Sequence, residues 1–209
     1  MKTSIKSLIA LAITAVVLTS SSVSANATES KKVTVLSQVK KVSKINVSGN
    51  VELILVQSAD ESVKVYNDYY ASNALVQQKD GELRISSFNK ETLTVIVYVT
   101  NLSKITAADN ATVKTYGKFN VLSLDVTLKD QATAVLNTNT ISLSTDLGGR
   151  SALTLTGTTD EYNAVMGSVA KVNMDQFAAQ STNIQSKNGV IARVASTVEL
   201  PSADDLFNL

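Results

Sequence analysis

The sequence predicts an all-β protein: a right-handed parallel β-helix (β-solenoid) with coils of about 19–21 residues, continued or capped by N-terminal strands. The first observation behind this prediction is a turn-and-strand unit that recurs between Leu102 and Val194. Its turn quartets start 21, 19, 19 and 19 residues apart, at Ala108–Ala111, Lys129–Ala132, Gly148–Ser151, Gly167–Ala170 and Ser186–Gly189. A fixed period near 20 residues is typical of stacked coils that bury their apolar side chains against their neighbours.

The second observation is an apolar residue five positions into each unit: Val113, Ala134, Leu153, Val172 and Ile191. The third is the composition, because 44% of the residues are hydrophobic but only 5% are aromatic. Small β-branched side chains suit narrow, stacked strands better than a bulky globular core. We therefore expect each unit to hold two strands of about five residues. Second corners are expected at Gly117–Lys118, Asn137–Asn139 and Thr156–Thr158.

The first 27 residues have the pattern of a secretory signal peptide. Lys2 and Lys6 precede an apolar run from Leu8 to Leu18, and Ala25 and Ala27 supply the small residues of a cleavage site. The run is shorter than the roughly 20 residues that a membrane-spanning helix requires. We expect an exported chain that is periplasmic, surface-located or secreted, without a membrane span after cleavage.

The remaining chain divides by its strand patterns. Residues 28–41 are expected to hold a polar lead and a first strand, residues 42–195 the main domain with its repeats at 102–195, and residues 196–209 a tail. Leu206, Phe207 and Leu209 in that tail either cap the open end of the stack or belong to a frayed acidic segment. Within the domain, Asp80-Gly81 favours a hairpin because both positions tolerate positive φ. Residues 68–78 fit a helical turn or a long loop equally well.

Several N-terminal segments resemble a known family. Val42–Leu53, followed by Glu61–Val65, Asp80–Ile85 and Val95–Val99, resembles the putative auto-transporter adhesin, head GIN domain family. The resemblance covers about Val39 to Val194, and it implies a β-helix, a role in adhesion and no catalytic residues to carry over. The turns here contain fewer glycines than the family's Ser-Gly-Ala-Ser turns. Asp-Asn and Lys-Asp corners are therefore expected to adopt the left-handed conformation in place of glycine.

The residue inventory argues against an enzyme. The chain has no histidine and no cysteine, which excludes Ser-His-Asp and Cys-His catalysis, ordinary zinc sites and disulfides. Asp109 and Asp130 are second in their quartets, and their carboxylates could stack to bind a cation or serve catalysis. Solvated corner residues are the simpler interpretation. We expect no cofactor and no metal.

The net charge and the positions of the tyrosines indicate which classes of binding partner to expect. Without Lys2 and Lys6, the 19 basic residues become 17 against 18 acidic residues, so nothing in the charge favours nucleic acid. Tyr66, Tyr69, Tyr70 and Tyr98 lie close in sequence, and exposed tyrosines commonly contact sugars or proteins. Packing in the core is the alternative role. Tyr69 and Tyr70, in the irregular segment, are the candidate recognition residues.

Three hypotheses follow from the sequence. The first is an exported, non-enzymatic domain that binds a glycan or a protein at a cell surface through a flat sheet face. The second is a structural or stress protein of the bacterial envelope without a dedicated ligand. The third is a carbohydrate-active enzyme that uses Asp109 and Asp130. The sequence leaves the ligand and the oligomeric state undetermined.

Overall fold

The structure, a computed structural model, describes residues 33–66 and 74–187. Three groups of predicted features lie outside these ranges: the cleavage site at Ala25 and Ala27, the tyrosines Tyr69 and Tyr70, and the tail at 196–209. In the described part of the chain, no helix has the length and hydrophobicity to cross a membrane.

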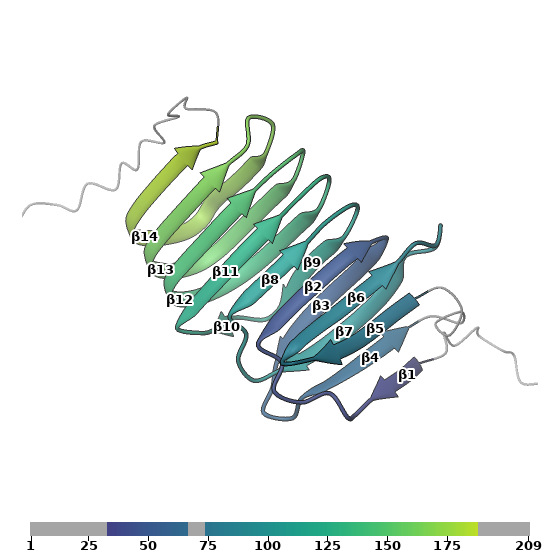
Figure 1. The fold of residues 1–209 in the computed structure, drawn as a ribbon. Helices are drawn as coiled ribbons and strands as arrows, with labels where there is room; N and C mark the ends of the chain where they lie inside the picture. The colour runs from purple at the N-terminus through teal and green to yellow at the C-terminus, as the bar shows by residue number, and fades with distance from the viewer. Residues whose placement is uncertain (1–32, 67–73, 188–209) are drawn as a thin grey trace, which may run out of the picture. The chain divides into compact units, whose positions relative to one another are not determined.

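The described residues form strands that join into one sheet (Figure 1). The first seven are β1 (Val33–Leu36), β2 (Lys44–Gly49), β3 (Val51–Gln57), β4 (Ser62–Tyr66), β5 (Ala74–Lys79), β6 (Glu82–Ser87) and β7 (Leu93–Val99). The others are β8 (Lys104–Ala107), β9 (Thr112–Tyr116), β10 (Phe119–Asn120), β11 (Ser123–Leu128), β12 (Thr133–Leu147), β13 (Ala152–Met166) and β14 (Lys171–Ser186).

The sheet folds back on itself at β12. Eleven strands follow one hydrogen-bonded path, β1-β4-β7-β3-β9-β12-β11-β8-β2-β6-β5. The first part of β12, Thr133–Val135, pairs with β9, whereas its last part, Ser142–Leu147, pairs with β11. Strands β4, β7, β3 and β9 therefore form one layer, and β6, β2, β8 and β11 form the other (Figure 1). Beyond β12, β13 and β14 add to the sheet in parallel.

The prediction of a right-handed parallel β-helix is wrong, although the all-β class is correct. The sheet is curled and mixed, because β1–β4, β4–β7 and β5–β6 pair antiparallel. The hairpin at Asp80-Gly81 is confirmed, with φ of 50° and 76° at these residues and Lys79 paired with Glu82. A two-residue connection allows only antiparallel neighbours, since parallel strands need a long crossover. A regular period in the C-terminal half carries no information about these N-terminal pairings.

The predicted coils with two short strands are also corrected. β12 and β13 run for 15 residues each and include the segments 137–139 and 156–158 that were expected to be corners, with a positive φ of 101° at Gly157. Asn137, Thr138 and Asn139 pair with Thr156, Gly157 and Thr158 in a continuous parallel ladder. Threonine is β-branched and therefore favours the extended backbone of a strand. The ladder also satisfies the backbone hydrogen bonds along this stretch.

The core lies between the two layers and follows from strict alternation. In β7 and β3 every second residue is buried, and the same holds in β2 and β6. Leu53 and Val95 from one layer and Ile45, Leu83 and Ile105 from the other are at most 1% exposed and belong to one apolar cluster. Aliphatic side chains thus supply most of the core, as the composition predicts.

One tyrosine is an exception in this aliphatic interior. Tyr162 on β13 is 1% exposed, and its ring meets Phe177 of β14 edge to face with centroids 5.7 Å apart. Its hydroxyl shares a hydrogen bond of 3.0 Å with Thr145 Oγ1. Burial disfavours the phenolate and raises the pKa of the Tyr162 hydroxyl above its ordinary value.

The turn between β2 and β3 requires glycine. Gly49 has a φ of 81°, and a Cβ there would lie 2.0 Å from the Ser87 carbonyl oxygen. We expect Gly49→Ala to lower the free energy of unfolding by about 3 kcal/mol, from the positive φ and the displaced Ser87 backbone together. Gly117 is a matched control, with a φ of 77° and no atom within 4 Å of its would-be Cβ. Gly117→Ala should cost only about 1 kcal/mol. Urea unfolding measures both, and equal losses would contradict the steric argument.

Alkaline pH provides a test of the buried tyrosine. Because the folded-state pKa of Tyr162 is raised, its contribution to stability is complete below the unfolded-state pKa of about 10 and is lost as the pH rises through the folded-state pKa. Urea unfolding of the wild type should show this loss. In Tyr162→Phe the corresponding part of the pH dependence should be missing. Identical pH profiles for the two proteins would show that Tyr162 does not titrate as its burial demands.

Candidate functional site

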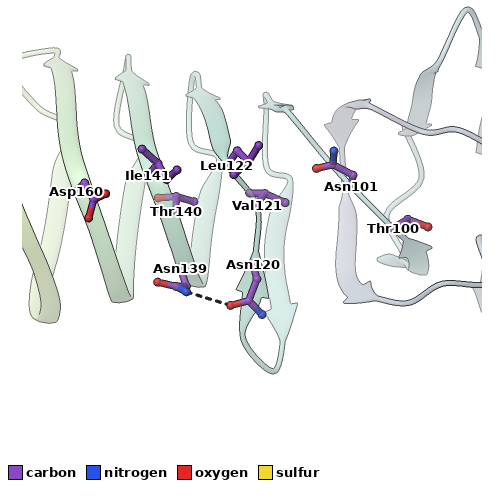
Figure 2. Close-up of a pocket in the computed structure, with 9 residues that line it drawn as sticks. All are labelled: Thr100, Asn101, Asn120, Val121, Leu122, Asn139, Thr140, Ile141 and Asp160. Carbon is purple, nitrogen blue, oxygen red and sulfur yellow. Dashed lines mark hydrogen bonds between the residues drawn. The ribbon is translucent and has the colours of Figure 1, made fainter.

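A groove of about 520 Å³ lies where β12 and β13 pass from one layer to the other (Figure 2). Asn120, Val121 and Leu122 line it from β10 and the connection to β11, and Asn139, Thr140 and Ile141 line it from the middle of β12. Asp160 of β13 extends this wall. Thr100 and Asn101, which follow β7, lie across from it (Figure 2). The volume is within the range of about 300–1,000 Å³ typical of small-molecule sites.

The polar side of the groove is a row of neighbouring side chains on successive strands. Asn120 pairs in register with Asn139, and Asn139 with Thr158. Asn139 Nδ2 donates to Asn120 Oδ1 at 3.3 Å, and Thr158 Oγ1 donates to Asn139 Oδ1 at 2.6 Å. These bonds orient the amides, yet the Nδ2 of Asn120 donates to no acceptor among the described residues.

Gln57, at the end of β3, fixes the distance between the two sides of the groove. Its Oε1 accepts the Asn120 backbone N–H at 2.9 Å, and its Nε2 donates to the Asn120 carbonyl at 2.7 Å. The same Nε2 donates to the Thr100 carbonyl at 3.2 Å. One side chain therefore connects Thr100 on one side with Asn120 on the other, which preorganises the groove.

The remaining lining combines aliphatic carbon with one carboxylate. Leu122, in the connection between β10 and β11, is 74% exposed, and Ile141 of β12 is 53% exposed. The Ile141 N–H bonds to the Leu122 carbonyl at 3.0 Å. Asp160 Oδ1 accepts a hydrogen bond of 2.8 Å from Gln180 Nε2. No lysine or arginine is among the lining residues.

The outward surface of the layer β4-β7-β3-β9 has a different character. We call it the tyrosine face and define it by Ile54, Val56, Tyr66, Ile96, Tyr98, Tyr116 and Val135, together with Lys64, Lys114 and Glu52. Register places these side chains in rows: Ile54 lies beside Ile96 and Lys114, and Val56 beside Tyr98 and Tyr116. Their inward neighbours along each strand are buried in the core, so these side chains point outward.

The charged groups of the tyrosine face are matched within the face. Lys64 Nζ lies 4.9 Å from the centroid of the Tyr98 ring, a cation–π geometry. Lys114 Nζ forms an ion pair with Glu52 Oε1 at 2.8 Å. The edge strand β1 extends the apolar surface, because Val33 and Val35 are 43% and 55% exposed and pair with Tyr66 and Lys64.

The opposite layer is more polar on its outward surface, although Leu75 of its edge strand β5 is 45% exposed and pairs with Ser86. The outward positions of β2, β6, β8 and β11 are all polar: Lys44, Asn46, Ser48, Glu82, Arg84, Ser86, Lys104, Thr106, Ser123, Asp125 and Thr127. A sheet layer with one solvated face ordinarily places polar residues outward, as this layer does. The apolar outward residues of the tyrosine face are therefore the departure that needs a reason.

Asp109 and Asp130 lie in adjacent turns, and the structure gives their carboxylates a local role. Asp109 Oδ2 accepts the Gly49 N–H at 3.0 Å, and Asp130 Oδ2 accepts the Asp109 N–H at 3.3 Å. Both residues have positive φ, 59° and 58°, as the sequence predicts for corners without glycine. Gly149 occupies the next turn with a φ of 62°, and a Cβ there would lie 2.7 Å from the Asp130 carbonyl oxygen. The two carboxylates thus bond the backbone of the preceding turn.

Sequence reasoning missed the groove and placed the aromatic residues only in part. It treated Asn139 as part of a corner, whereas the structure brings Asn139 into one groove with Asn120 and Asp160. The 19-residue interval between Asn120 and Asn139 was the available signal. Tyr66 and Tyr98 are half-buried on an outward face, and Tyr116 joins them at 76% exposure. No group of three or more acidic, histidine or cysteine residues suited to a metal ion occurs in residues 33–66 and 74–187.

Comparison with known proteins identifies the family. A model of the family described as putative auto-transporter adhesin, head GIN domain, matches residues 41–201, and the chain belongs to this family. A search of curated proteins finds no match.

Solved structures share the fold. A putative adhesin from Parabacteroides distasonis is 18% identical, with a TM-score of 0.58 over 74% of this chain and 77% of that chain. A putative adhesin from Parabacteroides merdae is 12% identical, with a TM-score of 0.55 over 74% of this chain and 77% of that one. A putative lipid binding protein from P. distasonis is 11% identical, with a TM-score of 0.56 over 74% and 78%. At these identities the likeness concerns the fold alone.

The turn carboxylates can be tested by a matched pair of substitutions. Asp109→Ala removes the acceptor of the Gly49 N–H and places alanine at positive φ, so we expect a loss of about 2 kcal/mol in the free energy of unfolding. Asp109→Asn keeps an acceptor oxygen and tolerates this φ, and should lose less than about 0.5 kcal/mol. Calcium should leave the melting temperature of both variants and of the wild type unchanged. A calcium-dependent rise confined to the wild type would instead identify a cation site.

Proposed function

We propose that the mature chain is an exported, non-catalytic domain that binds a protein at a cell surface through the tyrosine face. The observation that carries the proposal is the contrast between the two outward surfaces, one rich in tyrosine and aliphatic residues and one polar at every outward position of β2, β6, β8 and β11. Contiguous exposed apolar surface is uncommon on soluble proteins and marks interaction sites. Membership of an adhesin family supports the same function, and a signal peptide that ends at Ala27 would direct the chain to export before its removal.

The chemistry of the tyrosine face favours a protein partner. Tyrosine is enriched in protein interfaces because it buries a large rigid ring and still offers a hydroxyl. Lys64 is engaged by Tyr98 and Lys114 by Glu52, so the face has no unmatched cation row to attract nucleic acid or another polyanion. The side chains of the tyrosine face lie in rows across neighbouring strands and form a flat surface without a cleft among the described residues. A flat surface of this kind suits a protein partner.

Binding measurements with two tyrosine variants test this proposal. Tyr98→Ala and Tyr116→Ala should each weaken binding at least about tenfold, because interface tyrosines typically contribute 1–2 kcal/mol or more. Thr127→Ala, on the polar layer, is the control and should bind like the wild type. The probes are immobilised fibronectin, laminin and mucin, and intact epithelial cells with and without protease treatment.

Three results would contradict the proposal. Binding that is lost after glycosidase but kept after protease would assign the partner to glycans. A dimer in sedimentation experiments that Tyr116→Ala dissociates would assign the face to a second copy of the chain. Absence of binding to every probe would favour the structural envelope protein without a dedicated ligand.

A further inference from the structure

We propose that the groove between Thr100 and Asp160 is a second site, separate from the tyrosine face, and that it binds one or two residues of a neutral saccharide. This inference goes beyond the proposed function, because it concerns different residues and a different ligand class. It starts from the chemistry of the lining, which combines amides, a carboxylate and exposed aliphatic side chains and contains no cation.

The polar groups suit sugar hydroxyls. Asn120 Nδ2 has no acceptor among the described residues, and Asp160 uses only Oδ1, in its bond with Gln180. An amide donor and a carboxylate oxygen together match hydroxyl groups, each of which donates one hydrogen bond and accepts others. Because Asn139 is bonded to both Asn120 and Thr158, the amide row is oriented before a ligand arrives.

The apolar groups suit the carbon face of a sugar ring. Leu122 and Ile141 are adjacent and largely exposed, so they offer aliphatic surface beside the polar row (Figure 2). A ligand with hydroxyls at its edge and C–H groups on its face would cover both at once. A purely aliphatic ligand would displace water from the amides and the carboxylate without replacing its hydrogen bonds, which is costly.

The negative charge of Asp160 favours neutral saccharides over anionic ones. Among residues 33–66 and 74–187, Asp160 is the only charged group that lines the groove, so a uronic acid, sialic acid or phosphate would approach a carboxylate with no compensating cation from these residues. Like-charge contact of this kind opposes binding. Neutral hexoses and N-acetylhexosamines meet no such repulsion.

Gln57 is a positioning residue in this proposal. Its side chain binds the backbone of Asn120 on one side of the groove and of Thr100 on the other, and it is not itself a lining residue. Loss of this connection removes no side chain that lines the groove, but the distance between Thr100 and Asn120 is then no longer fixed. Gln57→Ala should therefore weaken affinity without removing any group that touches the ligand.

The experiment titrates cellobiose, lactose and N,N′-diacetylchitobiose into the mature protein and follows binding by saturation-transfer NMR and calorimetry. 3′-Sialyllactose is the anionic comparison. We expect at least one neutral disaccharide to bind at millimolar concentration or better, and sialyllactose to bind at least tenfold more weakly. Asp160→Ala and Asn139→Ala should each weaken the neutral disaccharide at least tenfold, and Gln57→Ala at least threefold.

Two controls separate this site from the tyrosine face and from misfolding. Tyr116→Ala should leave disaccharide binding unchanged, and so should Asn46→Ala on the polar layer. Asp160→Asn retains an acceptor oxygen but removes the negative charge, and it should keep most of the affinity while reducing the discrimination against sialyllactose. Melting temperatures of all variants establish that they are folded.

The proposal is overturned if no neutral disaccharide binds at 10 mM, or if sialyllactose binds as tightly as lactose. It is also overturned if Tyr116→Ala abolishes disaccharide binding while Asp160→Ala does not, since the sugar would then occupy the tyrosine face. Failure of the protein-binding assays leaves this test intact, because the variants expected to weaken disaccharide binding (Asp160, Asn139 and Gln57) are not those expected to weaken protein binding (Tyr98 and Tyr116).

Discussion

The pairing of β12 with two different strands is the constraint on which the structure depends. Its first residues bond to β9 and its last residues to β11, so one continuous strand belongs to both layers. A strand can do this only by curving, and its curvature brings the inward residues of the two layers into one core. The same passage from layer to layer positions Asn139, Thr140 and Ile141 beside the groove. Fold and groove thus have a common physical origin.

The turns show how backbone conformation is stabilised without many glycines. Asp109 and Asp130 adopt the left-handed backbone conformation, and the carboxylate of each accepts a backbone N–H from a neighbouring turn. Gly149 follows in the next turn, where the Asp130 carbonyl leaves no room for a Cβ. Aspartate thus occupies two turns in which its carboxylate accepts an N–H of the neighbouring turn, and glycine occupies the turn in which a Cβ would meet the Asp130 carbonyl. The carboxylates of Asp109 and Asp130 occupy the same position in successive repeats, and these hydrogen bonds account for them without a metal or catalytic site.

The two layers share a core but face solvent differently. Folding requires only that the inward residues be apolar, and both layers meet this requirement equally. The outward residues are free of that demand, and on β2, β6, β8 and β11 they are polar. Ile54, Ile96, Tyr98 and Tyr116 add nothing to the core from their outward positions. The proposed binding function would give a reason for these outward residues.

The sequence by itself determined the all-β class, the hairpin at Asp80-Gly81, the left-handed corners at Asp109 and Asp130 and the family. These features depend on alternation within a strand, on local turn chemistry or on matched motifs, all of which a single segment carries. Only the tertiary structure decided that β1, β4 and β7 pair antiparallel, that β12 spans both layers, and that Asn120 and Asp160 share a groove. The physical reason is that alternation specifies which side of a strand is buried but not which strand lies beside it. The choice of neighbour is made by hydrogen bonding and packing between segments far apart in the chain.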